Sequence, residues 1–290
     1  MYYGLIVVSV VMFGFCFKLS DVYRRVRGAG LAAVLSSALV SSLASIIPLA
    51  IIAGFNFEST PFTIIMAFSA ALNGMLFTYC SLKALGKIDL ALYSLFSMLG
   101  GMILPFVQGI AFYGEPITLA KGVCFVLISI ALLISTKTGG KSKGGFIYYI
   151  GIFVLNGMSG VLSRIYVSSP YPKTSSSVYS LWGSIISFAL AAIVIAVLLA
   201  LGKINLKGES LRSVSVAAAN GVVNKIANLL LVISLAFVDS SLQYPMVTGG
   251  VMIVSTVFSL LDKEKKTELR ELISVALAFL GTLALFLIPI

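Results

Sequence analysis

The sequence predicts an all-α integral membrane protein, with ten transmembrane helices in two inverted-topology five-helix repeats. Of its 290 residues, 59% are hydrophobic and only 10% are charged. Soluble domains carry about 25% charged residues and lack repeated apolar runs of span length. The apolar runs here are continuous, which favours helices over the alternating strands of a membrane barrel. Because a span takes about 20 residues, ten spans and their turns fill the chain.

Five spans are expected in the first half of the chain. They cover residues 2–19, 29–53, 61–85, 89–113 and 119–135. No basic segment precedes the first span and no small-residue cleavage site follows it, so we expect a retained span rather than a signal peptide. A short basic turn, Asp21–Gly28, comes next. Thr60 and Pro61 place a cap residue before a proline that suits the first helical position. Asp89 is expected to cap the fourth span, and a Gly-Glu-Pro turn at 114–116 leads into the fifth.

A stretch rich in Gly and Lys, residues 136–145, separates the two halves. It divides one membrane domain into a first repeat, 1–139, and a second, 140–290. The second repeat has spans expected at 146–167 and 175–201, between Arg212 and Asp239, from 239 to 261, and from 272 to 290. Asp239 is expected to cap the ninth span.

The two halves resemble each other at a nearly constant offset. Lys18 aligns with Arg164, and Asp89 aligns with Asp239. Matches between apolar residues arise easily by chance, whereas charged pairs and capping aspartates in the same order do not. Because five is an odd number, the second half enters the membrane in the opposite direction. This arrangement is typical of transporters.

Basic residues gather in the loops that follow the odd-numbered spans. These residues are Arg24, Arg25, Arg27, Lys87, Lys137, Lys141, Lys143, Lys203, Lys207, Arg212, Lys263, Lys265, Lys266 and Arg270. The opposite side has only Lys121 and Lys173. Since cytoplasmic loops are enriched in Lys and Arg, we predict these odd loops in the cytoplasm and both termini outside, in a plasma (inner) membrane. The net charge of +10 then reflects topology, and no nucleic-acid partner is expected.

The sequence contains no pattern that points to catalysis or to a cofactor. It has no histidine, the commonest metal ligand. Its three cysteines, Cys16, Cys80 and Cys124, fall within spans, where they are expected to act as small packing residues. There is no phosphate-binding loop and no nucleophile–base set. We therefore expect no enzyme activity, no metal and no cofactor.

The strongest candidate site lies in the eighth span. Its polar residues are Asn220, Asn224, Asn228 and Lys225, and the asparagines recur every four residues, so they share one helix face. Lys225 lies near the middle of the span, about 15 Å from either interface, which is further than its side chain can reach. We therefore expect it to face a hydrated cavity or a partner. The asparagines could instead hold helices together, at about 0.6 kcal/mol each.

The distribution of acids sharpens this expectation. All ten Asp and Glu residues fall in loops or at span ends. None is placed to pair with Lys225 or to bind a cationic drug. Either the substrate supplies the negative charge, or the amine is neutral in its apolar surroundings.

Further candidates surround this stripe. Asn73 in the third span precedes a glycine, as Asn220 does. Gln243 and Tyr244 flank Pro245, and helix irregularities recur at transporter sites. Trp182 could line the cavity or belong to an interfacial aromatic belt. Lys18 and Arg164 lie near span ends, where snorkelling is the alternative to a substrate contact. The full set of expected substrate contacts is Lys225, Asn224, Asn228, Asn73, Gln243, Tyr244, Trp182, Lys18 and Arg164.

The chain resembles the drug/metabolite transporter superfamily, in particular its ten-span EamA-like members. The resemblance covers the whole chain and rests on short motifs: Phe13-Gly14 followed by Lys18, the segment Gly114–Gly122, Tyr244-Pro245, and the two five-span halves. It implies that spans 1–4 and 6–9 line a central cavity and that spans 5 and 10 are peripheral. It also implies alternating access. Most members are thought to have cytoplasmic termini, contrary to the charge count here.

Together these observations predict a secondary transporter for a small polar organic metabolite that is anionic or zwitterionic. One alternative is a multidrug-type exporter of aromatic or cationic compounds, against which the missing membrane carboxylate argues. A lipid flippase is a further alternative. The expected partners are the solute and the lipid bilayer, with a possible homodimer through spans 5 or 10.

Overall fold

The computed structural model describes residues 2–28, 30–85, 90–135, 146–205, 209–260 and 269–288. These residues form ten helices and no strand, which confirms the all-helical prediction for this part of the chain. The helices are α1 (Tyr2–Arg27), α2 (Leu31–Ile52), α3 (Pro61–Leu85), α4 (Leu90–Tyr113), α5 (Leu119–Ser135), α6 (Phe146–Ser168), α7 (Ser176–Ala200), α8 (Leu211–Ser234), α9 (Ser240–Leu260) and α10 (Leu269–Leu287).

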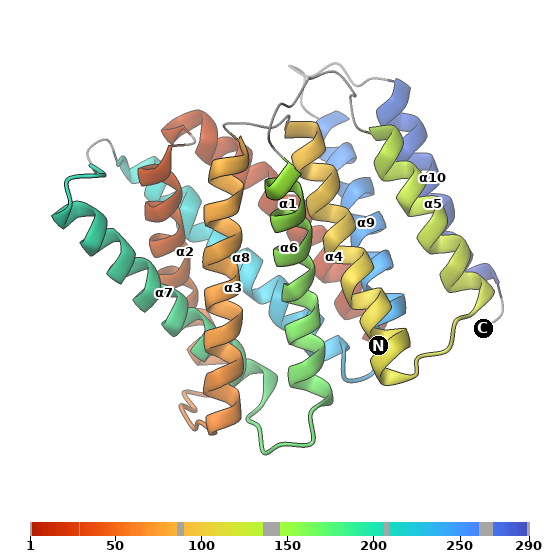
Figure 1. The fold of residues 1–290 in the computed structure, drawn as a ribbon, viewed down its shortest axis with the longest axis horizontal. Helices are drawn as coiled ribbons and strands as arrows, with labels where there is room; N and C mark the ends of the chain where they lie inside the picture. Colours follow the sequence, from red (N-terminus) through yellow and green to blue (C-terminus); the bar gives the residue numbers. More distant parts are fainter. Residues whose placement is uncertain are drawn as a thin grey trace.

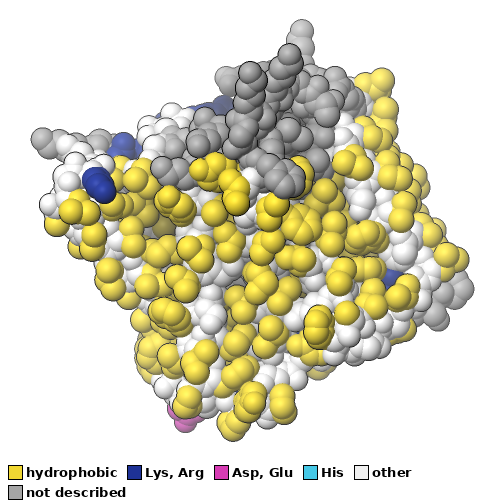
Figure 2. All heavy atoms as spheres, in the orientation of Figure 1, with side chains coloured by type: hydrophobic (Ala, Val, Ile, Leu, Met, Phe, Trp, Pro, Cys, Tyr) yellow, Lys and Arg dark blue, Asp and Glu magenta, His cyan; other side chains and the backbone are white. Residues whose placement is uncertain are grey.

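Seven of these helices are long and apolar enough over their described residues to cross a membrane: α1, α2, α3, α4, α6, α7 and α8. Two shorter apolar segments, Leu119–Ile134 and Leu272–Leu285, lie in α5 and α10. Figure 2 shows a broad apolar band over the visible face, with basic side chains mainly along its upper rim and an acidic side chain at its lower edge. The fold is therefore that of a multi-pass membrane protein.

Successive helices run in alternate directions, so both chain termini lie at the same end of the bundle (Figure 1). The helices of the two halves are interleaved. Helix α1 packs against α8 and α9, α6 packs against α3 and α4, and α2 packs against α7 and α8. Helices α5 and α10 pack against each other at one side of the bundle. We call the end that carries the α1–α2 and α7–α8 connections the basic end.

The first helix is longer than the sequence suggested. The predicted basic turn at Asp21–Gly28 is wrong, because α1 continues to Arg27. Arg25 Nη2 lies 2.8 Å from Asp21 Oδ2, one helical turn away, and Arg27 Nε lies 2.8 Å from Glu209 Oε1 at the start of α8. These charge pairs offset the poor fit of charged residues to an apolar span.

Close approach of α2 and α8 sets the position of the candidate polar stripe. A Cβ atom on Gly221 would lie 2.4 Å from the Cα atom of Ser41, so only glycine permits this spacing. The Ser41 hydroxyl also donates to the Ala217 carbonyl at 2.8 Å. Small interfacial residues are the usual means of bringing membrane helices together. They fix the turn of α8 that carries Asn224, Lys225 and Asn228.

Candidate functional site

Helix α8 carries the polar residues of the site, and its start is stabilised by hydrogen bonds from side chains. Its first turn has a reciprocal cap, in which the Ser210 hydroxyl accepts from the Ser213 amide and the Ser213 hydroxyl accepts from the Ser210 amide. Such a cap satisfies amide groups that would otherwise lack partners. Asn228 Nδ2 donates to both the backbone carbonyl and Oδ1 of Asn224, at 2.8 and 3.0 Å. This pair fixes the two amide side chains relative to each other.

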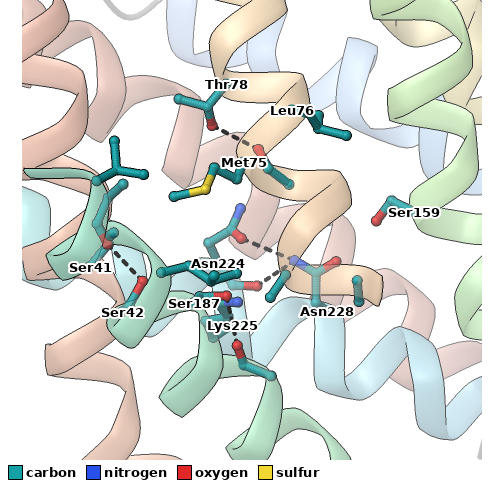
Figure 3. Close-up of a pocket in the computed structure, with 18 of the residues that line it drawn as sticks. Ser41, Ser42, Met75, Leu76, Thr78, Ser159, Ser187, Asn224, Lys225 and Asn228 are labelled. Carbon is teal, nitrogen blue, oxygen red and sulfur yellow. Dashed lines mark hydrogen bonds between the residues drawn. The ribbon is translucent and has the colours of Figure 1, made fainter. Parts of the chain in front are cut away.

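A cavity of about 650 Å³ lies beside this helix. Its walls come from α2, α3, α6, α7 and α8, and Figure 3 shows Ser187, Asn224, Lys225 and Asn228 among its lining side chains. Most of the remaining wall is aliphatic. Among the described residues that line this first cavity, Lys225 is the one charged residue.

A second cavity of about 390 Å³ adjoins the first. Both are lined by four polar residues that we call the polar belt: Ser159, Ser163, Asn224 and Asn228. Beyond the belt the walls of the second cavity are mixed, with the aromatic residues Phe13, Phe17, Phe77 and Tyr244 among aliphatic and polar ones. The lining residues of the two cavities come from α1–α4 and α6–α9. The site is therefore a polar belt shared by two cavities: a largely aliphatic one that contains Lys225 and a second one with four aromatic residues on its walls.

Lys225 makes no hydrogen bond or ion pair with any residue that the structure describes. Its side chain is partly buried. No carboxylate in the described ranges lines either cavity. The arrangement is an amine on the wall of a cavity, bordered by amide and hydroxyl groups.

The lining of the first cavity extends from near the basic end of the bundle towards the opposite end. It includes Leu31 in the first turn of α2 and Leu198 in the last turns of α7, both close to the basic end. At the other end the lining stops at Tyr179 and Val232. These two belong to a buried cluster that we call the aromatic floor: Met66, Ala67, Tyr166, Tyr179 and Val232. The rings of Tyr166 and Tyr179 stack at 3.9 Å.

Arg164 lies outside the lining of both cavities. Its Nη2 lies 2.8 Å from Glu115 Oε1, and its Nη1 donates to the Leu235 carbonyl at 2.8 Å. The Glu115 carboxylate also accepts the backbone amides of Ser240 and Ser241, at 2.9 and 2.7 Å, and so holds the start of α9. The sequence placed Arg164 at the substrate, whereas the structure places it in a contact between α4, α6, α8 and α9.

A second ion pair, which is only partly buried, lies close by. Lys121 Nζ is 2.7 Å from Asp239 Oδ2 and also donates to the Pro116 carbonyl at 3.0 Å. We call Glu115, Arg164, Lys121 and Asp239 the ionic cluster. All four lie at the end of the bundle opposite the basic end, near the start of α9.

Several other predicted contacts lie away from the cavities. Asn73 Nδ2 donates to the Leu155 carbonyl at 2.9 Å and so links α3 to α6. Gln243 is fully buried between Ser234 Oγ, at 2.7 Å, and the Leu231 carbonyl, at 3.1 Å. Each side chain thus joins two neighbouring helices.

Trp182 packs beside the aromatic floor, and its Nε1 donates to the Glu58 carbonyl at 3.3 Å. Lys18 lies on α1 and lines neither cavity. Tyr244 does line the second cavity, and its hydroxyl donates to the Gly160 carbonyl at 3.2 Å. Lys225, Asn224, Asn228 and Tyr244 are thus the predicted residues that the structure brings together around the two cavities.

Some lining residues were missed in the sequence. The cavity walls contain the serines Ser41, Ser42, Ser159, Ser163 and Ser187. Serine is common in packed membrane helices, so single serines carry little signal. Tyr179 also lines the first cavity, and its side chain is buried in the aromatic floor. In the sequence, Tyr179 is marked only by its place in the first turn of α7. That place is equally compatible with a tyrosine at the membrane interface and with one buried in the aromatic floor.

Neither a family model nor a curated protein matches this sequence. Solved structures match by fold, in 29 chains. One of them, described only as a crystal structure of a protein, has 14% sequence identity and a TM-score of 0.76. The match covers 97% of this chain and 94% of that chain. At this identity the likeness shows the fold alone.

Proposed function

We propose that this protein is a secondary transporter that moves a small anionic or zwitterionic organic metabolite by alternating access. The observation that carries the proposal is Lys225 on the wall of a cavity, with no protein partner among the described residues. A charged residue at the bilayer centre costs about 2.5–3.5 kcal/mol on insertion scales. A negatively charged solute would offset that cost when it binds.

The shape of the first cavity supports alternating access. It reaches the basic end of the bundle, whereas the aromatic floor separates it from the opposite end. A transporter needs a central site that is open to one side at a time. With basic loops in the cytoplasm, the side of the bundle that this cavity approaches would be the cytoplasmic side.

The helix contacts support two inverted repeats, 1–139 and 140–290. If each helix is replaced by its counterpart in the other half (α1 by α6, α3 by α8, α4 by α9), the contact of α1 with α8 becomes that of α6 with α3. In the same way, the contact of α1 with α9 becomes that of α6 with α4. The contacts of α2 with α7, α4 with α9 and α5 with α10 map onto themselves. A two-fold relation between the halves produces such a pattern. It supports the ten-span EamA-like architecture of the drug/metabolite transporter superfamily.

The test is exchange in proteoliposomes with three solutes of one skeleton: a carboxylate, its primary amide and the corresponding amine. The protein should exchange the carboxylate, and Lys225→Met should abolish that exchange. Lys203→Met is the matched control, because Lys203 is exposed in the α7–α8 connection. Exchange of the amine alone, or unchanged carboxylate exchange by Lys225→Met, would refute the proposal. The first result would favour the multidrug-type alternative.

A further inference from the structure

The charge of the first cavity limits the net charge of its ligand. Lys225 supplies one positive charge, and no carboxylate among the described residues lines either cavity. A monoanion therefore neutralises the site. A zwitterion would bring an ammonium group into a cavity that has no described counter-charge and already holds Lys225. Like charges brought together without solvent are strongly unfavourable.

Five hydroxyl groups of the cavity already donate their protons to backbone carbonyls. Ser42 donates its proton to the Ala38 carbonyl at 2.7 Å, and Ser187 donates to the Gly183 carbonyl at 2.6 Å. Ser41, Thr78 and Ser163 likewise donate to backbone carbonyls, at 2.8, 2.9 and 2.9 Å. A hydroxyl has one proton and two lone pairs. Each of these oxygens can thus accept a further hydrogen bond from a ligand.

The amide pair adds another acceptor. Asn228 uses its Nδ2 on Asn224, so its Oδ1 is the group left for the cavity. A ligand that uses these acceptors carries an anionic group for Lys225 and a hydrogen-bond donor for the surrounding oxygens. Because an ammonium donor has no described counter-charge here, the donor must be neutral. A hydroxyl group meets this requirement.

Much of the rest of the first cavity is aliphatic, with Tyr79 and Tyr179 as its aromatic residues. Leu35 on α2, Met75 on α3, and Leu190, Val194 and Leu198 on α7 form much of its wall. Burying apolar surface against such walls contributes about 25 cal/mol per Å². The third part of the ligand is therefore an aliphatic group.

We propose that the first cavity binds a 2-hydroxycarboxylate with an aliphatic side chain, an inference that rests on the proposed function. The carboxylate pairs with the ammonium of Lys225. The 2-hydroxyl donates to a serine oxygen of the wall, with Ser42 and Ser187 as its acceptors. The side chain packs on the aliphatic residues of α2, α3 and α7. The net charge of the ligand distinguishes it from an amino acid of the same skeleton.

The test uses three ligands that differ only at carbon 2: 4-methylpentanoate, 2-hydroxy-4-methylpentanoate and leucine. Their equilibrium binding to the purified full-length protein is measured by titration calorimetry. A hydroxyl that gains one neutral hydrogen bond should tighten binding about fivefold relative to 4-methylpentanoate. Leucine should bind at least about tenfold more weakly than the hydroxy acid.

Two variants assign the hydroxyl contact. In the double variant Ser42→Ala, Ser187→Ala, the hydroxy acid should lose its advantage over 4-methylpentanoate, while 4-methylpentanoate binds as before. Ser215→Ala is the control, because Ser215 is exposed on α8, bonds to the Leu211 carbonyl and lines neither cavity. An advantage that survives in the double variant overturns the hydroxyl assignment. Melting curves of each variant confirm that it folds.

The outcomes separate this inference from the proposed function. Leucine that binds as tightly as the hydroxy acid, and loses binding in Lys225→Met, overturns the hydroxycarboxylate inference and leaves the anion or zwitterion transporter standing. If none of the three ligands binds but exchange of another carboxylate still depends on Lys225, the hydroxycarboxylate inference is overturned and the proposed function stands. When only amines are exchanged, both proposals fail.

Discussion

Lys225 and Arg164 are two cations in the same apolar bundle, with opposite surroundings. Arg164 has a carboxylate at 2.8 Å and a carbonyl at 2.8 Å, and it lies outside both cavities. Lys225 lines a cavity of about 650 Å³ and has no partner among the described residues. The first cation is part of what holds the helices together. Lys225 remains available to a ligand that enters the cavity.

The contrast separates structural charges from functional ones. Breaking a buried ion pair leaves an uncompensated charge and is strongly destabilising. Removing a charge that has no partner instead removes the free-energy cost of holding that charge in an apolar environment. Stability measurements on matched variants can therefore assign each cation to one class, without knowledge of the ligand.

The largest expected effect is at Glu115, whose side chain is 3% exposed. Glu115→Ala removes the partner of Arg164 and the acceptor for the amides of Ser240 and Ser241. We expect the free energy of unfolding in mixed micelles to fall by about 3–5 kcal/mol. Glu58→Ala is the control, since Glu58 is exposed in the α2–α3 connection. Equal stability of the two variants would show that the ionic cluster does not hold the bundle.

Acid should weaken the same contact. Burial raises the pKa of Glu115, but hydrogen bonds from Ser241 and Ser240 lower it more, so the pKa in the folded protein lies below its ordinary value of 4.5. Its stabilisation is then fully present above about pH 4.5 and is lost as the pH falls through the lowered pKa. Melting temperature measured from pH 7 to pH 3 should drop less steeply in Glu115→Gln than in the wild type. Identical profiles would contradict the assignment.

A smaller loss is expected at the second ion pair. The side chain of Lys121 is 3% exposed, whereas that of Asp239 is 41% exposed. After Lys121→Met, water can solvate the aspartate, so no fully buried charge is left behind. We expect a loss of about 1 kcal/mol in the free energy of unfolding. A loss as large as that of Glu115→Ala would mean that Asp239 is less hydrated in solution than its exposure indicates.

Much of the helical fold could be predicted from the sequence, because span length and apolar runs are local properties. The span expected at 61–85 coincides with α3, since Thr60 and Pro61 mark its start. The end of α1 was mispredicted. A run of charges resembles a loop until its partners are known, and one partner, Glu209, lies far along the chain.

The candidate site could be predicted only in part. Lys225, Asn224 and Asn228 stand out because polar groups are rare in the middle of an apolar span. Gln243 and Asn73 stood out for the same reason. In the structure, however, the side-chain amide of each donates a hydrogen bond to a backbone carbonyl of a neighbouring helix. Whether a buried polar side chain faces a cavity or a carbonyl depends on helix rotation, and apolar periodicity is weak in helices surrounded by lipid.

The ionic cluster depends even more on tertiary structure. Glu115 and Arg164 lie in different halves of the sequence, in a loop and near a span end. Each position is ordinary for a charged residue. Their pairing arises because α6 packs against α4 beside the start of α9.

The most direct test of the central claim is the stability of Lys225→Met, measured by equilibrium unfolding in mixed micelles with and without 2-hydroxy-4-methylpentanoate. Without ligand, the variant should be more stable than the wild type, by up to about 3 kcal/mol. The ligand should stabilise the wild type and leave the variant unchanged. A variant less stable than the wild type in the absence of ligand would show that Lys225 already has a partner within the protein, and would contradict the account.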